Sequence, residues 1–229
     1  MPFAFTLHNI KSKGFSLIEL MIGMTLGSFL LLGIIASFSA ASAAFIAISD
    51  RYELLQNASR GLRFISTASR EAGFPNLTDG NYPVPISASS QKSAGDDILI
   101  LEGWSRQNCF GNANPSVDSD NRPGLFFRVQ RFQRTNDSLR WRCGYGSNSS
   151  SLVIQSNNQT IINNVSAFRV RYFEDSNLDG SVDRAVNAGD WTTNTAIQQL
   201  EITLLLHTDS NKPESITSFR SIVRLRNAG

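Results

Sequence analysis

Oxygen-bearing side chains gather at alternate positions in one short stretch of the chain. The set is Asp175, Asn177, Asp179, Ser181 and Asp183. Hard cations such as calcium take about six to eight oxygen ligands, and alternating side chains around a central glycine, here Gly180, can wrap one ion. The backbone carbonyl of Ser181 would supply a further ligand. This spacing predicts a calcium-binding loop.

Two interpretations of this loop stay open. At the twelfth position an EF-hand has a glutamate that binds through both of its oxygens, whereas this chain has Val186. The departure argues against complete EF-hand geometry and tight affinity. The alternative is a hairpin loop rich in Asp, Asn and Gly, whose side chains cap backbone groups without holding an ion.

The cysteines suggest a covalent link. Cys109 and Cys143 are the two in the chain, with no histidine beside either and no Cys-x-x-Cys spacing, so the pattern does not favour zinc or redox catalysis. Outside the cytosol such a pair is typical of one disulfide. Closing a loop of about 35 residues would stabilise the fold by about 3–4 kcal/mol in the chain-entropy model. The alternative is two buried free thiols.

Residues suited to catalysis are sparse. His8 and His207 are the only histidines and lie far apart in the sequence. Asp96 and Asp97 adjoin a predicted strand, but neighbours on a strand point to opposite faces, which disfavours a paired acid/base role. No glycine-rich phosphate loop followed by lysine is present. We therefore expect a protein that is not an enzyme.

The N-terminal segment predicts a membrane anchor. From Phe15 to Ser49 the only charged side chain is Glu19. A membrane helix needs about 20 apolar residues, which Leu17–Phe38 supplies. Lys11 and Lys13 precede it, so the positive-inside rule predicts a single pass through the inner membrane, with the rest of the chain in the periplasm.

Glu19 is the anomaly in this segment. A carboxylate in an apolar membrane helix costs about 2.5 kcal/mol or more unless it is paired. If the chain is cut between Gly14 and Phe15, the new amino group lies one helical turn before Glu19 and can neutralise it, within one chain or between neighbours. The alternative is a glutamate whose side chain reaches the cytoplasmic interface.

The sequence Lys13-Gly14-Phe15-Ser16-Leu17-Ile18-Glu19-Leu20 closely resembles the class III signal of type IV prepilins and type II secretion pseudopilins. The resemblance implies that a prepilin peptidase cuts after Gly14 and methylates the new N-terminus at Phe15. It also implies a role for Glu19 in assembly.

The helical pattern continues beyond the membrane segment. Apolar residues recur at steps of three and four among charged ones, as in an amphipathic helix. They are Tyr52, Leu54, Leu55, Ala58, Leu62, Ile65 and Ala68. Gly73 and Pro75 predict the end of the helix, by a left-handed cap and by a block to continuation. One helix of about 55 residues resembles the spine helix of pilins.

Alternating β-type runs follow this helix. They are Asp97–Trp104, Leu125–Phe132, Leu139–Cys143, Leu152–Gln155, Thr160–Phe173, Leu200–His207 and Ile216–Leu225. We expect an antiparallel sheet packed on the amphipathic half of the helix, an α+β fold. The predicted divisions are a leader (1–14), the transmembrane half of the helix (15–38), its amphipathic half (39–73) and a β-rich periplasmic head (74–229).

Motifs in the head resemble PilW-like minor pilins. They are Asp97–Ile100, Cys109 with Gly111, Trp141–Gly144, Val165–Asp183, Trp191, Leu200–Leu206 and Val223–Asn227. The resemblance implies a minor pilin in a priming or tip complex of a type IV pilus, first in the inner membrane and then at the cell surface. The implied partners are other minor and major pilins, the prepilin peptidase, the assembly platform and a tip adhesin.

Two alternatives to this function remain: a type II secretion pseudopilin of the J type, and a pilus-tip adhesin module. Nucleic acid is not expected as a dedicated partner. The net charge is +2, and Lys11 and Lys13 of the predicted leader account for the excess of basic residues. The rest of the chain therefore lacks the positive charge on which nucleic-acid binding depends. Calcium is the one cofactor that the sequence suggests.

Overall fold

The structure is a computed structural model of residues 1–229. It describes residues 14, 16–75, 84–87, 90–92, 96–116, 124–154, 158–177, 179–188, 190, 197–208 and 216–225. The predicted leader up to Lys13, the predicted methylation site Phe15, Trp191 and the ending Arg226-Asn227 lie outside the described residues.

One helix, α1, runs over Leu17–Glu71 and has 55 residues. Gly73 follows it with a φ of 72°, a conformation that glycine adopts without steric cost, so the predicted left-handed cap is confirmed. The chain divides into two compact units, Met1–Ser49 and Asp50–Gly229, each described here by itself.

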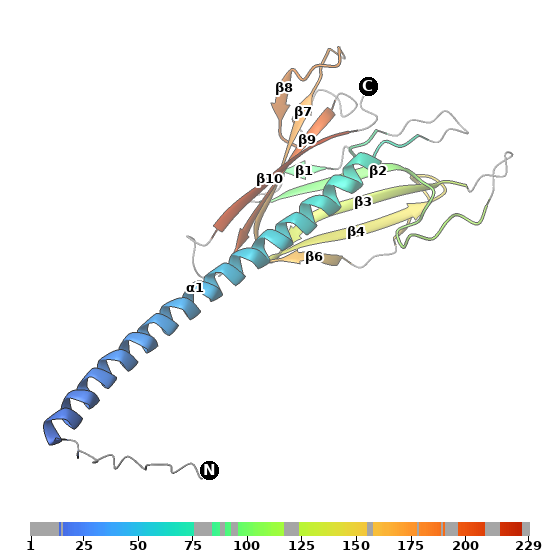
Figure 1. The fold of residues 1–229 in the computed structure, drawn as a ribbon. Helices are drawn as coiled ribbons and strands as arrows, with labels where there is room; N and C mark the ends of the chain where they lie inside the picture. The colour runs from blue at the N-terminus through green and yellow to red at the C-terminus, as the bar shows by residue number, and fades with distance from the viewer. Residues whose placement is uncertain are drawn as a thin grey trace, which may run out of the picture. The chain divides into compact units, whose positions relative to one another are not determined.

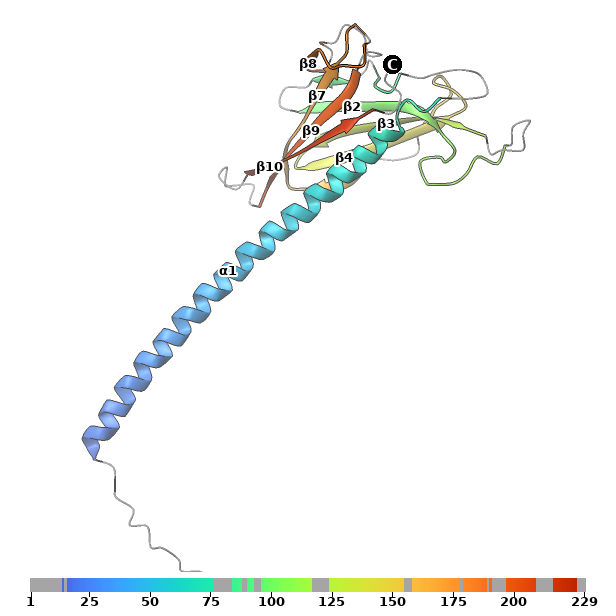
Figure 2. The ribbon, with the colours of Figure 1, turned by 45° about the horizontal axis from the view of Figure 1, so that its top comes forward.

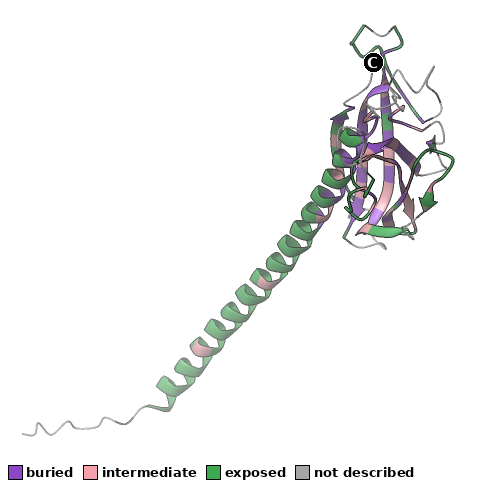
Figure 3. Ribbon diagram, turned by 90° about the vertical axis from the view of Figure 1, so that its right-hand side faces the viewer, coloured by how far each residue is buried: buried purple, intermediate pink, exposed green. Residues whose placement is uncertain are grey.

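The part of α1 in the first unit has no buried side chain among its described residues, and its leucines, isoleucines and phenylalanines are exposed (Figure 3). By length and composition α1 contains a segment able to cross a membrane. Three hydroxyls in this segment donate to carbonyls of the same helix: Thr25 to Ile22, Ser28 to Met24 and Ser39 to Ile35. These internal bonds satisfy the hydroxyl donors without water, as a membrane-spanning segment would require.

The second unit contains two antiparallel sheets where the sequence predicted one. The first sheet consists of β1 (Gln91–Lys92), β2 (Asp97–Ser105), β3 (Phe126–Thr135), β4 (Ser138–Gly146), β5 (Val153–Ile154) and β6 (Gln159–Asn163). Its order is β1-β2-β3-β4-β5, and β6 also pairs with β4. Asn136, with a φ of 55°, helps to make the tight turn between β3 and β4.

The second sheet has four strands in the order β10-β9-β7-β8. They are β7 (Val165–Glu174), β8 (Arg184–Val186), β9 (Ile197–His207) and β10 (Ile216–Arg224). In the views of Figures 1 and 2, β10 lies at the border of this sheet, next to β9.

The prediction of one strand over Thr160–Phe173 was wrong. The extended conformation is interrupted at Asn164, whose φ is 61°. The residues before it belong to β6 of the first sheet, and those after it belong to β7 of the second. A left-handed residue ends the regular extended backbone, and asparagine tolerates that conformation better than most side chains. The break sends the chain from one sheet to the other.

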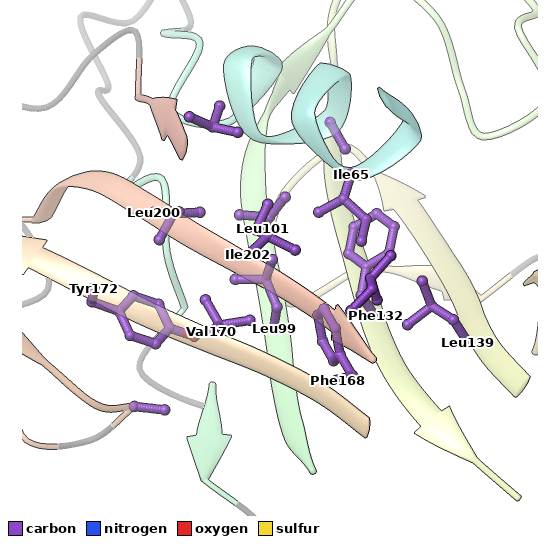
Figure 4. Close-up of a cluster of buried hydrophobic side chains, with 14 of the residues drawn as sticks. Ile65, Leu99, Leu101, Phe132, Leu139, Phe168, Val170, Tyr172, Leu200 and Ile202 are labelled. Atoms are coloured by element: carbon purple, nitrogen blue, oxygen red, sulfur yellow. The ribbon is translucent and has the colours of Figure 1, made fainter. Parts of the chain in front are cut away.

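Within the second unit, α1 packs on the inner faces of both sheets. Its buried side chains recur every three or four residues and include Leu54, Ala58, Ile65 and Ala68. At Gly61 a Cβ atom would lie 2.9 Å from the Cδ1 atom of Ile162, so a larger residue here would require that side chain to shift. Figure 4 shows Ile65 of α1 above core side chains that come from both sheets. The expected α+β class, a helix on antiparallel β-structure, is confirmed.

Candidate functional site

The first turn of α1 carries the carboxylate singled out in the sequence. The backbone N–H of Ser16 donates to Glu19 Oε2 at 3.2 Å, and the N–H of Leu20 donates to the carbonyl of Ser16 at 3.2 Å. The glutamate therefore accepts a hydrogen bond from the residue just before the helix, as in a capping box. The negative charge of Glu19 also lies near the positive, N-terminal end of the helix dipole, where it is stabilising.

This geometry sets what Glu19 can do chemically. Its carboxylate lies at the start of the helix, and Gly14, the predicted cut site, is two residues before Ser16. An amino group created near this point would meet a carboxylate already held at the helix start. Sequence reasoning missed the capping role, although the Ser-x-x-Glu spacing of Ser16 and Glu19 before an apolar run is its sequence signature.

The predicted disulfide joins Cys109 to Cys143, so this prediction is confirmed. Cys143 lies in β4 and is fully buried, whereas Cys109 belongs to a loop after β2. The loop is organised around Asn108, whose Oδ1 accepts the backbone N–H of Phe110 at 2.9 Å and of Asn112 at 3.0 Å. The link holds a compact, self-capped loop against the first sheet.

The five predicted calcium-binding residues lie in the turn between β7 and β8, with Gly180 at a φ of 89°. Asp175 is fully buried, and its two carboxylate oxygens accept the N–H groups of Asp179 at 3.1 Å and Gly180 at 2.7 Å. Gln198 also donates to Asp175. Asn177 accepts the N–H of Asp179 at 3.0 Å, and Asp179 accepts the N–H of Ser181 at 2.8 Å.

Asp183 closes the same turn. Its carboxylate accepts both the hydroxyl of Ser176 at 2.7 Å and the N–H of Ser176 at 2.8 Å. The hydroxyl and then the backbone of Ser176 hold the pKa of Asp183 below its ordinary value. The loop side chains thus satisfy backbone donors. Within the described part of the chain no group of three or more His, Cys, Asp or Glu side chains is arranged to hold a metal ion.

The predicted functional residues belong to separate parts of the chain. Glu19 belongs to the first unit, whereas the disulfide and the β7–β8 turn lie in the second, in different sheets. Asp96 and Asp97 have a structural role. Asp96 Oδ1 accepts the backbone N–H of Phe168 at 3.0 Å. Asp97 Oδ2 accepts the backbone N–H of Val170 at 2.7 Å. The two carboxylates thereby attach the first sheet to β7.

Comparison with known proteins identifies the N-terminal motif. The profile of the prokaryotic N-terminal methylation motif matches residues 9–35, which include Gly14 and Glu19. No curated protein matches the sequence significantly. Among solved structures, the type IV-like pilin TTHA1219 from Thermus thermophilus is similar, with 15% identity and a TM-score of 0.46. The similarity covers 77% of this chain and 97% of that one.

The methylation motif is followed at once by a long apolar helix whose later turns pack on antiparallel sheets, and these features support a type IV pilin-like protein. The motif and the apolar helix fit anchoring in a membrane and assembly into a pilus.

Proposed function

We propose that this pilin-like chain is a minor pilin of the PilW-like kind, which takes part in type IV pilus assembly within a priming or tip complex and catalyses no reaction. The observation that carries the proposal is the methylation motif with Glu19 fixed at the start of α1. The exposed apolar side chains of the first part of the helix support it, because such a surface needs either lipid or other chains to cover it.

In this proposal the chain begins as a single-pass protein of the inner membrane with its head in the periplasm. The prepilin peptidase removes the leader after Gly14 and methylates Phe15. The cleaved helix then leaves the lipid for a bundle of pilin helices, where the new amino group neutralises the carboxylate of Glu19, of its own or a neighbouring chain. Its partners are other minor and major pilins, the assembly platform and a tip adhesin.

Mass spectrometry of the N-terminus of the membrane-extracted protein tests the proposal. We expect a mature chain that starts at N-methyl-Phe15. A chain that still starts at Met1 would contradict the processing step and, with it, the assembly role. Deletion in the parent organism then separates the alternatives: loss of pili supports pilus assembly, loss of protein secretion with intact pili supports the pseudopilin, and intact pili that no longer attach support the adhesin module.

Calcium binding by the β7–β8 turn is a separate prediction. Asp175, Asn177, Asp179, Ser181 and Asp183 have the spacing for it, and their hydrogen bonds to backbone donors already shape the loop. Calcium at a hundred times its dissociation constant would stabilise the head by about 2.7 kcal/mol. Thermal unfolding with calcium, magnesium or chelator measures this. The increment should be specific to calcium and absent in Asp179→Ala; an unchanged melting temperature would contradict the prediction.

A further inference from the structure

The last strand, β10, has one unpaired edge. All nine of its residues, Ile216 to Arg224, pair with β9 on one side. Along its other side no described residue forms a backbone hydrogen bond with the strand. Alternate N–H and C=O groups of an edge strand point away from the sheet, so this edge offers a row of free donors and acceptors. Ile222, on this strand, is 59% exposed.

The other strands at the borders of the two sheets are shorter than β10, which has nine residues: β1 and β5 have two each, β6 has five and β8 has three. Strands inside the sheets are covered where their neighbours end. Along β2, Gly73 donates to the carbonyl of Glu102 at 2.8 Å, and Ser87 donates to that of Ile100 at 3.0 Å. The free side of β4 is covered by β5 and β6. The part of β7 that β8 does not reach is covered by Asp96 and Asp97. Proteins keep edge strands short because a long open edge recruits other strands, so the nine-residue edge of β10 stands out among the border strands.

The outer face beside this edge is basic. Cross-strand registers define three rows over β7, β9 and β10. They are Arg169-Thr203-Arg220, Arg171-Glu201-Ile222 and Phe173-Gln199-Arg224. The rows contain four arginines and one acidic residue, Glu201, which contacts Arg220 at 3.6 Å. None of the other three arginines has an ion pair among the described residues, and Arg171 and Arg224 are exposed.

This charge distribution selects the kind of strand that can pair with β10. In a fully overlapped antiparallel pair of two copies, the two Arg220 side chains would lie directly opposite each other, and both copies would bring basic faces together. Like charges directly opposite across strands are destabilising. A strand with acidic side chains opposite Arg220 and Arg224, and an apolar one opposite Ile222, complements the same face.

We propose that the free edge of β10 binds an extended acidic segment of another protein by strand addition. The segment adds a fifth strand to the second sheet, so main-chain hydrogen bonds supply affinity, while the arginine rows select the sequence. The pattern acid-x-apolar-x-acid reads the same in both directions and so meets Arg220, Ile222 and Arg224 in a parallel or an antiparallel pairing.

Peptide binding to the full chain in detergent micelles tests this inference. The probe is a labelled threonine-rich peptide in which two glutamates flank an isoleucine at alternate positions; its counterpart has lysines instead. A third peptide keeps the glutamates but is N-methylated at alternate backbone nitrogens, which removes the donors of one strand edge. Fluorescence anisotropy at physiological salt gives the three affinities.

We expect the glutamate peptide to bind at least tenfold more tightly than either of the other two. In the double variant Arg220→Glu/Arg224→Glu the preference should reverse in favour of lysine. The matched control, Arg63→Glu/Arg142→Glu, changes the net charge equally at exposed positions away from β10 and should keep the glutamate preference.

Three results would overturn the inference. Equal binding of the N-methylated peptide would show attraction to the basic face without strand addition. Equal binding of the lysine peptide would remove the role of the arginines. Absence of binding together with dimerisation of the chain would show that a second copy occupies the edge. None of these outcomes depends on cleavage after Gly14, so they leave the proposed pilin function to its own test.

Discussion

The two parts of α1 that belong to the two compact units, called its halves below, differ in what surrounds their apolar side chains. From Leu17 to Ser49 no described residue is buried, and leucines, isoleucines and phenylalanines occur on every side of the helix. From Asp50 to Glu71 the buried residues form a stripe at helical spacing, covered by both sheets. A helix that is apolar all round needs surroundings outside its own chain, whereas an amphipathic one finds them in the same domain.

This contrast predicts that substitutions in the two halves affect different measured properties. Substitutions in the first half should change assembly and leave the stability of the head unaltered. Substitutions in the second half, or in the sheets that cover it, should change the free energy of unfolding.

The largest effect is expected at Glu19. Glu19→Ala removes the carboxylate that would pair with the new amino group, so we expect at least a tenfold loss of the protein from sheared pili, with leader cleavage and head stability unchanged. Glu53→Ala, an exposed glutamate of the second half, is the matched control and should assemble normally. Recovery of Glu19→Ala in pili at the normal level would contradict its assembly role.

Removing the disulfide should have the largest effect on the head. Cys109→Ala/Cys143→Ala releases a link that spans 34 residues. The chain-entropy model gives a loss of about 4 kcal/mol in the free energy of unfolding. Denaturant unfolding followed by tryptophan fluorescence measures it in the full chain. Leader cleavage, which depends on the N-terminal motif, should continue. Failure of cleavage in this variant would show that the N-terminal segment and the head do not behave independently.

A matched pair of isoleucines tests the contrast directly. Ile65 is fully buried in the second half of α1, and Ile35 is 60% exposed in the first. Ile65→Ala should lower the free energy of unfolding of the head by about 3 kcal/mol, because it deletes buried carbon and leaves a cavity. Ile35→Ala should change it by less than about 0.5 kcal/mol. Equal losses in the two variants would show that the halves unfold as one cooperative unit.

The smallest expected effect concerns pH. The pKa of Asp183 is lowered, so its ionised form stabilises the fold above the ordinary value of 3.8, and this contribution disappears as the pH falls through the lowered pKa. Ser176→Ala removes the hydroxyl donor and should make the head slightly less stable at neutral pH. The difference from the unaltered protein should vanish in strong acid. A constant difference over this pH range would contradict the assigned cause.

Much of the helix was predictable because its signals are local. Apolar spacing predicted the buried stripe that includes Leu54, Ala58, Ile65 and Ala68, Gly73 and Pro75 predicted the end of the helix, and the two cysteines predicted the disulfide. The switch at Asn164 was not predictable, because apolar and β-branched residues continue on both sides and a single left-handed residue leaves no pattern. The hydrogen bonds that the Asp96 and Asp97 carboxylates accept from β7 were also not predicted, because β7 lies about 70 residues further along the chain.

The break at Asn164 also bears on the order in which the head folds. Every strand of the first sheet precedes this residue in the chain, and every strand of the second follows it. Both cysteines lie before it as well. Contacts that are close in sequence form faster than distant ones. The strands of the first sheet can therefore pair, and the two cysteines can form their disulfide, before the second sheet, with the open edge of β10, is completed.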